Sequence, residues 1–407
     1  MKMKTIAAID VGTTKVYTVI AEVGEDSSVK IIGAGLTPSR GLHKGMVVNI
    51  QEAAESIRES VKKAEQFSGY KIESAYIGVT GRHVTSLNNK GAVAITRGDR
   101  LVRSEDLRRV LQSAQSIIKL PSDRKLIHVI PRSYTVDGQV GVKNPVGMHG
   151  ARLDVETHVI TAAVTSVQNL VKCVRSIGVD VEDLVLEPIA SSEAVLTDEE
   201  KKAGVILADI GGGTTDICIF REGSIWHTAV VPVAGYQLTR DIAIGLGIPF
   251  EVAEEMKKRY GTVTPVFEPK KQTNIESPTD SHGGVNHQDL CEILRARVEE
   301  ILRLIILELP RGEYEEMVPA GLVLTGGSSN LAGIATLGEQ ILHMPVKVGV
   351  PNDIHGLTDT HDPAYATGLG LILWGAKNAT VHPWKTGSFG MGNRLFKFMS
   401  RIRGMFK

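Results

Sequence analysis

The strongest constraint on the fold is a short pattern that occurs twice. Residues 5–19 read TIAAIDVGTTKVYTV, and residues 204–220 read GVILADIGGGTTDICIF. In each copy a short apolar run ends on an aspartate, passes through glycine and two threonines, and resumes as alternating apolar residues. This pattern predicts a strand, a tight turn and a second strand. A single glycine-rich turn could belong to an ordinary hairpin, but duplication of the whole pattern favours a binding function.

The residue types in the two turns are suited to phosphate. Glycine has no Cβ, so peptide N–H groups can converge on an anion, and threonine adds hydroxyl donors. The aspartates before the turns, Asp10 and Asp209, would repel phosphate unless a divalent cation lay between them. Lys15 could reach the phosphates, or it could be a solvated lysine at a strand edge. The candidate phosphate ligands are Gly12, Thr13, Thr14, Lys15, Gly211, Gly212, Gly213, Thr214 and Thr215.

The two turns resemble the phosphate loops of the actin, heat-shock chaperone and sugar kinase superfamily, in which two similar domains close over ATP and a magnesium ion. Residues 322–328, LVLTGGS, resemble the adenosine-binding loop of that superfamily and add Gly326, Gly327 and Ser328 as candidates. The resemblance implies an α/β actin-like two-domain ATPase fold with duplicated mixed sheets flanked by helices. It also implies ATP and Mg²⁺ as cofactors, with Asp10 and Asp209 holding the metal through water.

A change of sequence texture at residues 83–161 predicts a small inserted α+β subdomain. Strands are expected at 92–96, 126–135 and 157–163, with a helix that begins near an N-cap at Ser104. The length and position of this segment resemble the FtsA family of actin-like bacterial cell-division proteins, in which an unrelated subdomain replaces one of actin's own. A C-terminal amphipathic helix completes the expected fold.

The expected domain boundaries follow from these motifs. The first actin-like domain is predicted at 1–82 and 162–195, the inserted subdomain at 83–161, and the second actin-like domain at 196–376, with an outer subdomain at 228–305 that includes a flexible loop at 262–288. A flexible tether is predicted at 377–392 and a membrane-targeting amphipathic helix at 393–407.

Three further positions are candidates for nucleotide chemistry. Glu187, in LVLEPIASSEA, could orient or deprotonate a water, or it could simply begin a helix before proline. Gly235 lies in the turn after a predicted strand. Glu254 and Lys257 lie three residues apart on a predicted helix, and the resemblance implies contacts with ribose and base; a surface ion pair is the alternative. Whether ATP is hydrolysed stays open.

A strongly amphipathic helix is predicted at residues 290–309. The resemblance implies that this helix belongs to the subdomain that receives the C-terminal peptide of FtsZ, the tubulin-like division protein. Arg297 and Glu300 are the candidate contacts. A solvated, charge-decorated face is the alternative.

The C-terminal segment is basic and amphipathic. No acidic residue follows Asp362, and residues 394–407 read RLFKFMSRIRGMFK. At helical spacing the apolar residues share one face and the basic residues another, which is typical of an interfacial membrane anchor. A helix that docks on a protein is the alternative. The candidate membrane residues are Leu395, Phe396, Lys397, Phe398, Met399, Arg401, Ile402, Arg403 and Phe406.

Composition excludes several classes. The 407 residues include 46 basic and 46 acidic side chains, which argues against a nucleic-acid partner. Three scattered cysteines favour reduced, structural thiols. The sequence has no run of 18 apolar residues and begins directly with a strand, so a cytoplasmic body is expected.

The FtsA-family resemblance implies a polymerising, ATP-binding adaptor that tethers the FtsZ division ring to the membrane and helps recruit later division proteins. Its partners would be FtsZ, further copies of itself head to tail, an anionic membrane surface, and other division proteins through the inserted subdomain. It would lie peripherally on the cytoplasmic face of the cell membrane at the septum. An actin-like pilus-assembly adaptor and a small-metabolite kinase are alternatives; the kinase would need a substrate base and has no use for the tail.

Overall fold

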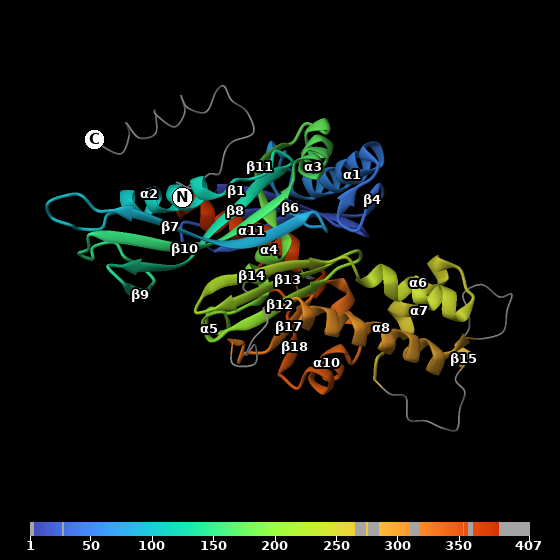
Figure 1. Ribbon diagram of the computed structural model, residues 1–407. Coiled ribbons are helices and arrows are strands. Elements are labelled where there is room, and N and C mark those ends of the chain that lie inside the picture. Colours follow the sequence, from blue (N-terminus) through green and yellow to red (C-terminus); the bar gives the residue numbers. More distant parts are fainter. Residues whose placement is uncertain are drawn as a thin grey trace.

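The computed structural model describes residues 4–26, 28–264, 274–275, 285–309, 317–352, 354–356 and 361–381. Two five-stranded sheets and one four-stranded sheet organise these residues (Figure 1). Most of the loop predicted at 262–288 and the amphipathic helix predicted at 393–407 lie outside the described residues. No helix within the described ranges has the length and apolar character needed to cross a membrane.

The first sheet contains the first copy of the repeated motif. Its strand order is β3 (Val29–Pro38), β2 (Lys15–Val23), β1 (Lys4–Val11), β6 (Ser74–Val79) and β11 (Asp180–Leu186). The strands β1 and β2 are antiparallel, and β6 and β11 continue the sheet in parallel. Helices α1 (Ile50–Ser68) and α3 (Val164–Ser176) bury apolar residues against one face, and α11 (Ala366–Val381) covers the other.

The second sheet has the same order and the same strand directions. It runs β14 (Ser224–Val231), β13 (Thr215–Arg221), β12 (Val205–Ile210), β17 (Leu322–Thr325) and β18 (Val346–Val348). The strands β12 and β13 are antiparallel, whereas β17 and β18 are parallel to β12. Helices α6 (Gly235–Leu246), α7 (Phe250–Tyr260), α8 (His287–Leu307) and α10 (Ile334–Leu342) share its core. The duplication expected from the motifs is therefore confirmed.

The inserted segment forms its own sheet, with the order β7 (Val84–Ala94), β10 (Arg152–Ala163), β8 (Arg124–Val136) and β9 (Gln139–Val142). Helix α2 (Ser104–Ile117) packs on this sheet. The strand expected at 92–96 begins eight residues earlier, because polar residues such as Asn89, which donates to the Ala114 carbonyl at 2.7 Å, hide the apolar alternation. The N-cap is Arg103 and not Ser104, because Asp106 accepts the Arg103 N–H at 2.9 Å.

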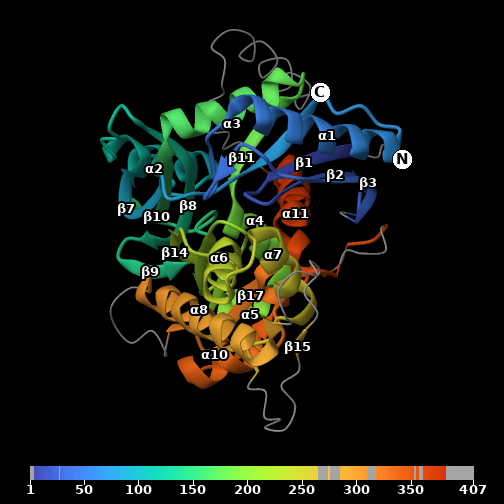
Figure 2. The same ribbon diagram turned by 90° about the vertical axis from the view of Figure 1, so that its right-hand side faces the viewer.

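Two helices connect the halves of the molecule. Helix α4 (Glu187–Val195) leads out of the first sheet, and α11 returns to it after the second sheet; Figure 2 shows both between the two halves. Because α11 continues to Val381, the first five residues of the tether predicted at 377–392 are helical instead. The remaining elements are α5 (Asp198–Ala203), β4 (Leu42–His43), β5 (Met46–Val47), β15 (Asn274–Ile275), β16 (Val285–Asn286), η1 (Gly327–Asn330) and η2 (Pro363–Tyr365).

Candidate functional site

The two repeated turns meet each other. A Cβ atom built on Gly213 would lie 2.4 Å from the hydroxyl oxygen of Thr13, and one built on Gly212 would lie 2.4 Å from the Thr14 methyl carbon. Real Cβ atoms do not approach other atoms so closely, so only glycine allows this contact. Glycine is therefore required at these positions for more than turn geometry, because it lets the first loop approach the backbone of the second.

Four carboxylic acids are buried around the turns: Asp10, Glu187, Asp209 and Asp216. Burial raises the pKa of Asp10 to about 7, with Lys15 opposing the change and Asp209 adding to it. Burial also raises the pKa of Asp216 to about 7 and holds that of Glu187 well above its usual range, with the neighbouring carboxylates adding to the effect. Lys15 offsets this concentration of buried acid only in part, so a cation would stabilise the site.

The donor set fits a hard divalent cation held largely through water. Carboxylate oxygens are the ligands that Mg²⁺ prefers, and Mg²⁺ usually keeps several of its waters. In the described part of the chain, no group of three or more His, Cys, Asp or Glu side chains is arranged to ligate a metal directly. A magnesium ion here would therefore depend on water and on the phosphates of its ligand, as the sequence suggested for Asp10 and Asp209.

The carboxylate of Asp209 is positioned by both connecting helices. The Ser191 hydroxyl on α4 donates to Asp209 Oδ2 at 2.5 Å, and the Thr367 hydroxyl at the start of α11 donates to the same oxygen at 2.9 Å. Gly326 has a φ of +84°, and a Cβ there would lie 2.2 Å from Asp209 Oδ1. The glycine of the predicted adenosine loop is thus required for its approach to the second phosphate loop.

Lys15 is not a solvated strand-edge lysine. Its Nζ donates to the carbonyl of Ala364, in η2 after the second sheet, and lies 4.8 Å from the centre of the Tyr365 ring. Burial lowers the pKa of Lys15, whereas Asp10 and Asp209 oppose that change. The ammonium group therefore reaches from the first half of the chain into the second, beside the acids.

Asp216 is a site residue that was not predicted. It is 2% exposed and accepts a hydrogen bond from the Thr80 hydroxyl at the end of β6. Asp216 directly follows the paired threonines of the second turn, which is the place that Lys15 holds in the first turn. Aligning the two turns residue by residue would have identified it. Its partner Thr80 carries no sequence signal, because the two meet only when both sheets are in place.

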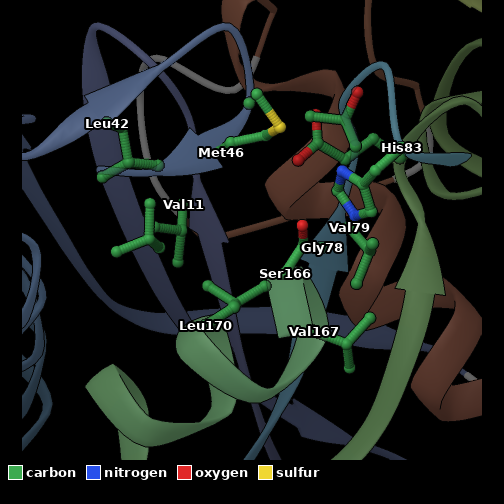
Figure 3. Close-up of a pocket in the computed structure, with 13 residues that line it drawn as sticks. Val11, Leu42, Met46, Gly78, Val79, His83, Ser166, Val167 and Leu170 are labelled. Atoms are coloured by element: carbon green, nitrogen blue, oxygen red, sulfur yellow. The ribbon is translucent and has the colours of Figure 1, made fainter. Parts of the chain in front are cut away.

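Glu187 is the first residue of α4, followed by Pro188, so it also satisfies the helix-starting interpretation. A Cβ on Gly78 would lie 3.2 Å from Glu187 Cγ. On one side Glu187 lines a small cavity of about 10 Å³ with His83, Met46, Leu170 and other, mostly apolar residues (Figure 3). That surrounding explains why burial dominates the raised pKa of the carboxyl.

The second loop rests on the start of α6. The N–H groups of Gly235 and Tyr236 donate to the carbonyls of Gly211 and Gly212 at 3.1 and 2.7 Å, and the Ser328 hydroxyl donates to the Gly211 carbonyl at 2.8 Å. Gly235, expected in a turn, is the first residue of this helix. A Cβ on it would lie 2.6 Å from Ser328 Oγ, so the candidate nucleoside residues pack directly against the loop.

Glu254 and Lys257 form an ion pair of 2.7 Å on α7. Lys257 Nζ also lies within hydrogen-bonding distance of the Thr239 hydroxyl at 2.8 Å and the Gly235 carbonyl at 3.3 Å. The Lys257 side chain is only 13% exposed. The pair is therefore not an ordinary solvated surface pair, and it lies beside the glycine that supports the second loop.

The structure leaves some predicted residues outside this cluster. The Thr215 hydroxyl donates to the Val233 carbonyl at 2.7 Å, so it supports its own sheet. Arg297 and Glu300 pair on α8, where Arg297 Nε also donates to Asp241 of α6 at 2.5 Å. A Cβ on Gly327, at the start of η1, would meet only Ala364 within 4 Å among the described residues. The predicted membrane residues, from Leu395 to Phe406, lie outside the described residues.

Comparisons with known proteins agree with this geometry. The family model "Cell division protein FtsA" matches residues 206–370, and "SHS2 domain inserted in FTSA" matches residues 81–161. The chain is 45% identical to the cell division protein FtsA of Pseudomonas aeruginosa, over 91% of this chain and 89% of that protein. It is 37% identical to the FtsA of Borreliella burgdorferi, over 100% and 99%, and 36% identical to that of Escherichia coli, over 92% and 91%.

Solved structures share the fold at lower identity. A chain of the PilM–PilN type IV pilus biogenesis complex matches with a TM-score of 0.64 and 19% identity, over 91% of this chain and 98% of that one. MreB 5 of Spiroplasma citri, bound to AMPPNP, matches with a TM-score of 0.56 and 13% identity, over 93% and 98%. Together with the near full-length relatives, these matches show that the chain belongs to the FtsA family of actin-like cell-division proteins.

Proposed function

We propose that the chain binds Mg-ATP between its two halves. The observation that carries this proposal is the contact between the two glycine–threonine turns, surrounded by buried acids with raised pKa values. Buried carboxylic acids without a compensating charge cost stability, and such costs are typical of functional sites. A bound magnesium ion would supply positive charge beside the acids, and the phosphates would accept hydrogen bonds from N–H groups of the turns.

Each group of residues has a distinct role in this proposal. The N–H groups of residues 12–14 and 212–214 and the Lys15 ammonium would bind phosphate oxygens. The Gly211 N–H donates to the Thr214 carbonyl at 2.9 Å and so supports the loop itself. Asp10 and Asp209 would orient the waters of the metal. The pair Glu254 and Lys257, with residues 326–328, would hold the nucleoside. Glu187 and Asp216 would orient a water near the phosphates, and magnesium, when bound, would supply positive charge beside the phosphate oxygens.

The proposed biological role is an adaptor that attaches the FtsZ division ring to the cytoplasmic face of the membrane at the septum, helps recruit later division proteins and polymerises head to tail. Family membership supports it, as does the acid-free basic segment after Asp362. A single amphipathic helix would bind an anionic membrane modestly, because each basic residue contributes about 1 kcal/mol near the surface. A polymer would present many such helices at once and bind strongly.

Co-sedimentation with anionic liposomes tests the adaptor role. The full chain is compared with a chain that ends at Gly392 and with the full-length variant Phe398→Asp, each with and without Mg-ATP. We expect only the unmodified full chain to pellet, and Mg-ATP to increase the pelleted fraction. If the truncated chain pellets equally well, the segment is not the anchor. If none of the chains pellets, the segment is instead a protein-docking helix.

Binding of the FtsZ C-terminal peptide tests the α8 surface. Arg297→Ala should weaken binding of this peptide, measured by fluorescence anisotropy, if Arg297 exchanges its intramolecular carboxylates for those of the peptide. Arg303→Ala, an exposed arginine on the same helix whose partner Glu299 lies 3.8 Å away, is the matched control. Equal affinities of the two variants would remove Arg297 from the interface.

A further inference from the structure

The inserted subdomain touches both halves of the molecule. The chain joins its base to the first half, because β7 follows β6 of the first sheet and β10 leads directly into α3. Ile127, Ile160 and Ala162 at this base lie in an apolar cluster that contains residues of both sheets, such as Ile77 and Cys218. Further from the base, side chains of β7, β8 and β10 rest on β14, the edge strand of the second sheet. The subdomain is therefore an arm fixed to one half and seated on the other.

The seat on β14 centres on Thr228. The Ser86 hydroxyl of β7 donates to the Thr228 carbonyl at 2.8 Å, and the Thr228 hydroxyl lies 2.9 Å from His158 Nε2 on β10. The other ring nitrogen of His158 lies 2.8 Å from the Asn88 side-chain oxygen. With Nδ1 donating to that amide oxygen, Nε2 accepts the Thr228 proton, so neutral histidine satisfies both contacts.

A second set of contacts lies beside it on the same strand. The guanidinium carbon of Arg132, on β8, lies 3.9 Å from the centre of the Trp226 ring, and that of Arg221 lies 5.0 Å from it. The Ser224 hydroxyl donates to the Arg132 carbonyl at 2.9 Å. A buried arginine against an indole face is a directional contact, so it is lost when the strands shift relative to each other.

The path from the seat to the nucleotide site is short. Strand β14 pairs with β13, and Thr228 lies opposite Cys218, two residues after Asp216. On the other side, β7 begins four residues after Thr80, whose hydroxyl binds Asp216. The base of the arm and its seat on β14 are therefore each close in sequence or pairing to a residue of the candidate site, and a change in the angle between the two halves would move them relative to each other.

We propose that the seat of the inserted subdomain on β14 is a latch that favours the closed arrangement of the two halves and is coupled to nucleotide binding. This proposal rests on the proposed Mg-ATP site. Coupling between binding and a conformational equilibrium is reciprocal: a nucleotide that favours closure strengthens the seat, and a weakened seat reduces nucleotide affinity by the same factor. A ligand of the inserted subdomain that pulls it off β14 would likewise lower nucleotide affinity.

The test uses the full chain and the variant Thr228→Val, which keeps the shape of the side chain but removes its hydroxyl. Its Kd for Mg-ATP should rise about three- to tenfold, the range for losing a buried hydrogen bond. Thr135→Val, on β8 of the same subdomain but without a described contact to β14, is the matched control and should leave Kd unchanged. Ser86→Ala provides a second variant should Thr228→Val fail to fold, and it should raise Kd in the same direction.

A second measurement separates the latch from the nucleotide proposal. In a chain that carries Trp374→Phe and Trp384→Phe, the fluorescence of Trp226 should be less accessible to acrylamide with Mg-ATP than without it. Thr228→Val should increase this accessibility without nucleotide. If accessibility rises but Kd does not change, the seat is a passive contact and the latch is overturned. If the unmodified chain binds no Mg-ATP, the proposed function fails first, whatever Trp226 reports.

Discussion

The candidate nucleotide site and the seat of the inserted subdomain on β14 both join the two halves of the chain, but with opposite kinds of chemistry. The site brings together buried acids, closely apposed glycines and one lysine that crosses to the other half. The seat of the inserted subdomain on β14 pairs His158 with the Thr228 hydroxyl and the Arg132 guanidinium with the Trp226 indole. The contacts on β14 are formed by groups of the chain itself, whereas the buried acids of the site would be stabilised by the proposed cation.

The two loops within the site also differ from each other. The first loop contributes threonine side chains and a lysine, and the second contributes a glycine surface and Asp216. A duplicated motif has therefore diverged into complementary surfaces. Single substitutions in the loops and at the seat on β14 should show which of the two regions depends on the ligand.

The largest effect is expected from Gly213→Ala. Its Cβ would meet three atoms of Thr13 at 2.4 to 2.9 Å, so the loops must separate and could no longer bind the same phosphates together. Overpacking of about 1–3 kcal/mol corresponds to a Kd for Mg-ATP raised about 5- to 150-fold. Gly98→Ala in the inserted subdomain, whose Cβ meets no described atom within 4 Å, is the control for titration calorimetry. Similar affinities of the two variants would show that the loops do not act together.

Lys15→Ala should weaken Mg-ATP binding about 10-fold or more, because a hydrogen bond to a charged group contributes about 1.5–3 kcal/mol. The matched control is Lys63→Ala on α1, an exposed lysine that also donates to a backbone carbonyl, that of Leu36 at 2.9 Å. Nucleotide affinity is measured for both variants. If Lys15→Ala binds Mg-ATP with unchanged affinity, the Lys15 ammonium of the unmodified chain bonds to the Ala364 carbonyl and not to the ligand.

Asp216→Asn should stabilise the chain in the absence of metal and nucleotide. Burial raises the folded-state pKa of Asp216 to about 7, above its usual value near 4, so between these values the folded chain binds more protons than the unfolded chain. Stability therefore falls as pH rises through this range. Removing the charge should increase the free energy of unfolding at pH 8 by about 1–2 kcal/mol, measured with urea. A lower free energy of unfolding for Asp216→Asn would contradict the expectation that the buried charge of Asp216 destabilises the fold.

The seat on β14, which includes His158, should contribute the opposite pH dependence to the free energy of unfolding, with a smaller magnitude. Burial, with His227 and Arg132 nearby, lowers the pKa of His158 to about 3, so between pH 3 and about 6.5 the unfolded chain binds the additional proton. Stability supplied by this group is therefore lost as pH falls, by about 1 kcal/mol between pH 7 and 5.5. His158→Gln should remove that part of the slope in urea unfolding, and His149→Gln, an exposed histidine of the same subdomain, should not. Identical slopes would exclude His158 as the cause.

Much of the fold could be predicted because its information is local. The repeated turns predicted both hairpins, β1–β2 and β12–β13. What could not be predicted depends on tertiary contacts. Strand β7 hides its pattern because Asn88 and Asn89 bond to His158 and to α2, and a Cβ built on Gly91 would lie 2.5 Å from the Ala114 nitrogen.

The same distinction applies to the site. The aspartates, glycines and lysine of the turns carry a sequence pattern, and the structure brings them together with Gly326 and Ser328. Thr80, Ser191 and Thr367 carry none, because a single hydroxyl becomes a site residue only through the strand or helix that places it beside Asp209 or Asp216. Asp216 lay inside a recognised motif and needed only the alignment of its two copies.

The most direct test of the central claim is a calorimetric titration of the full chain with ATP, in excess Mg²⁺ and after chelation with EDTA. We expect one binding site per chain and an affinity at least about tenfold weaker without the divalent cation, because the buried acids would then face the phosphates with no cation between them. Absence of binding at millimolar ATP, or equal affinity with and without Mg²⁺, would contradict it.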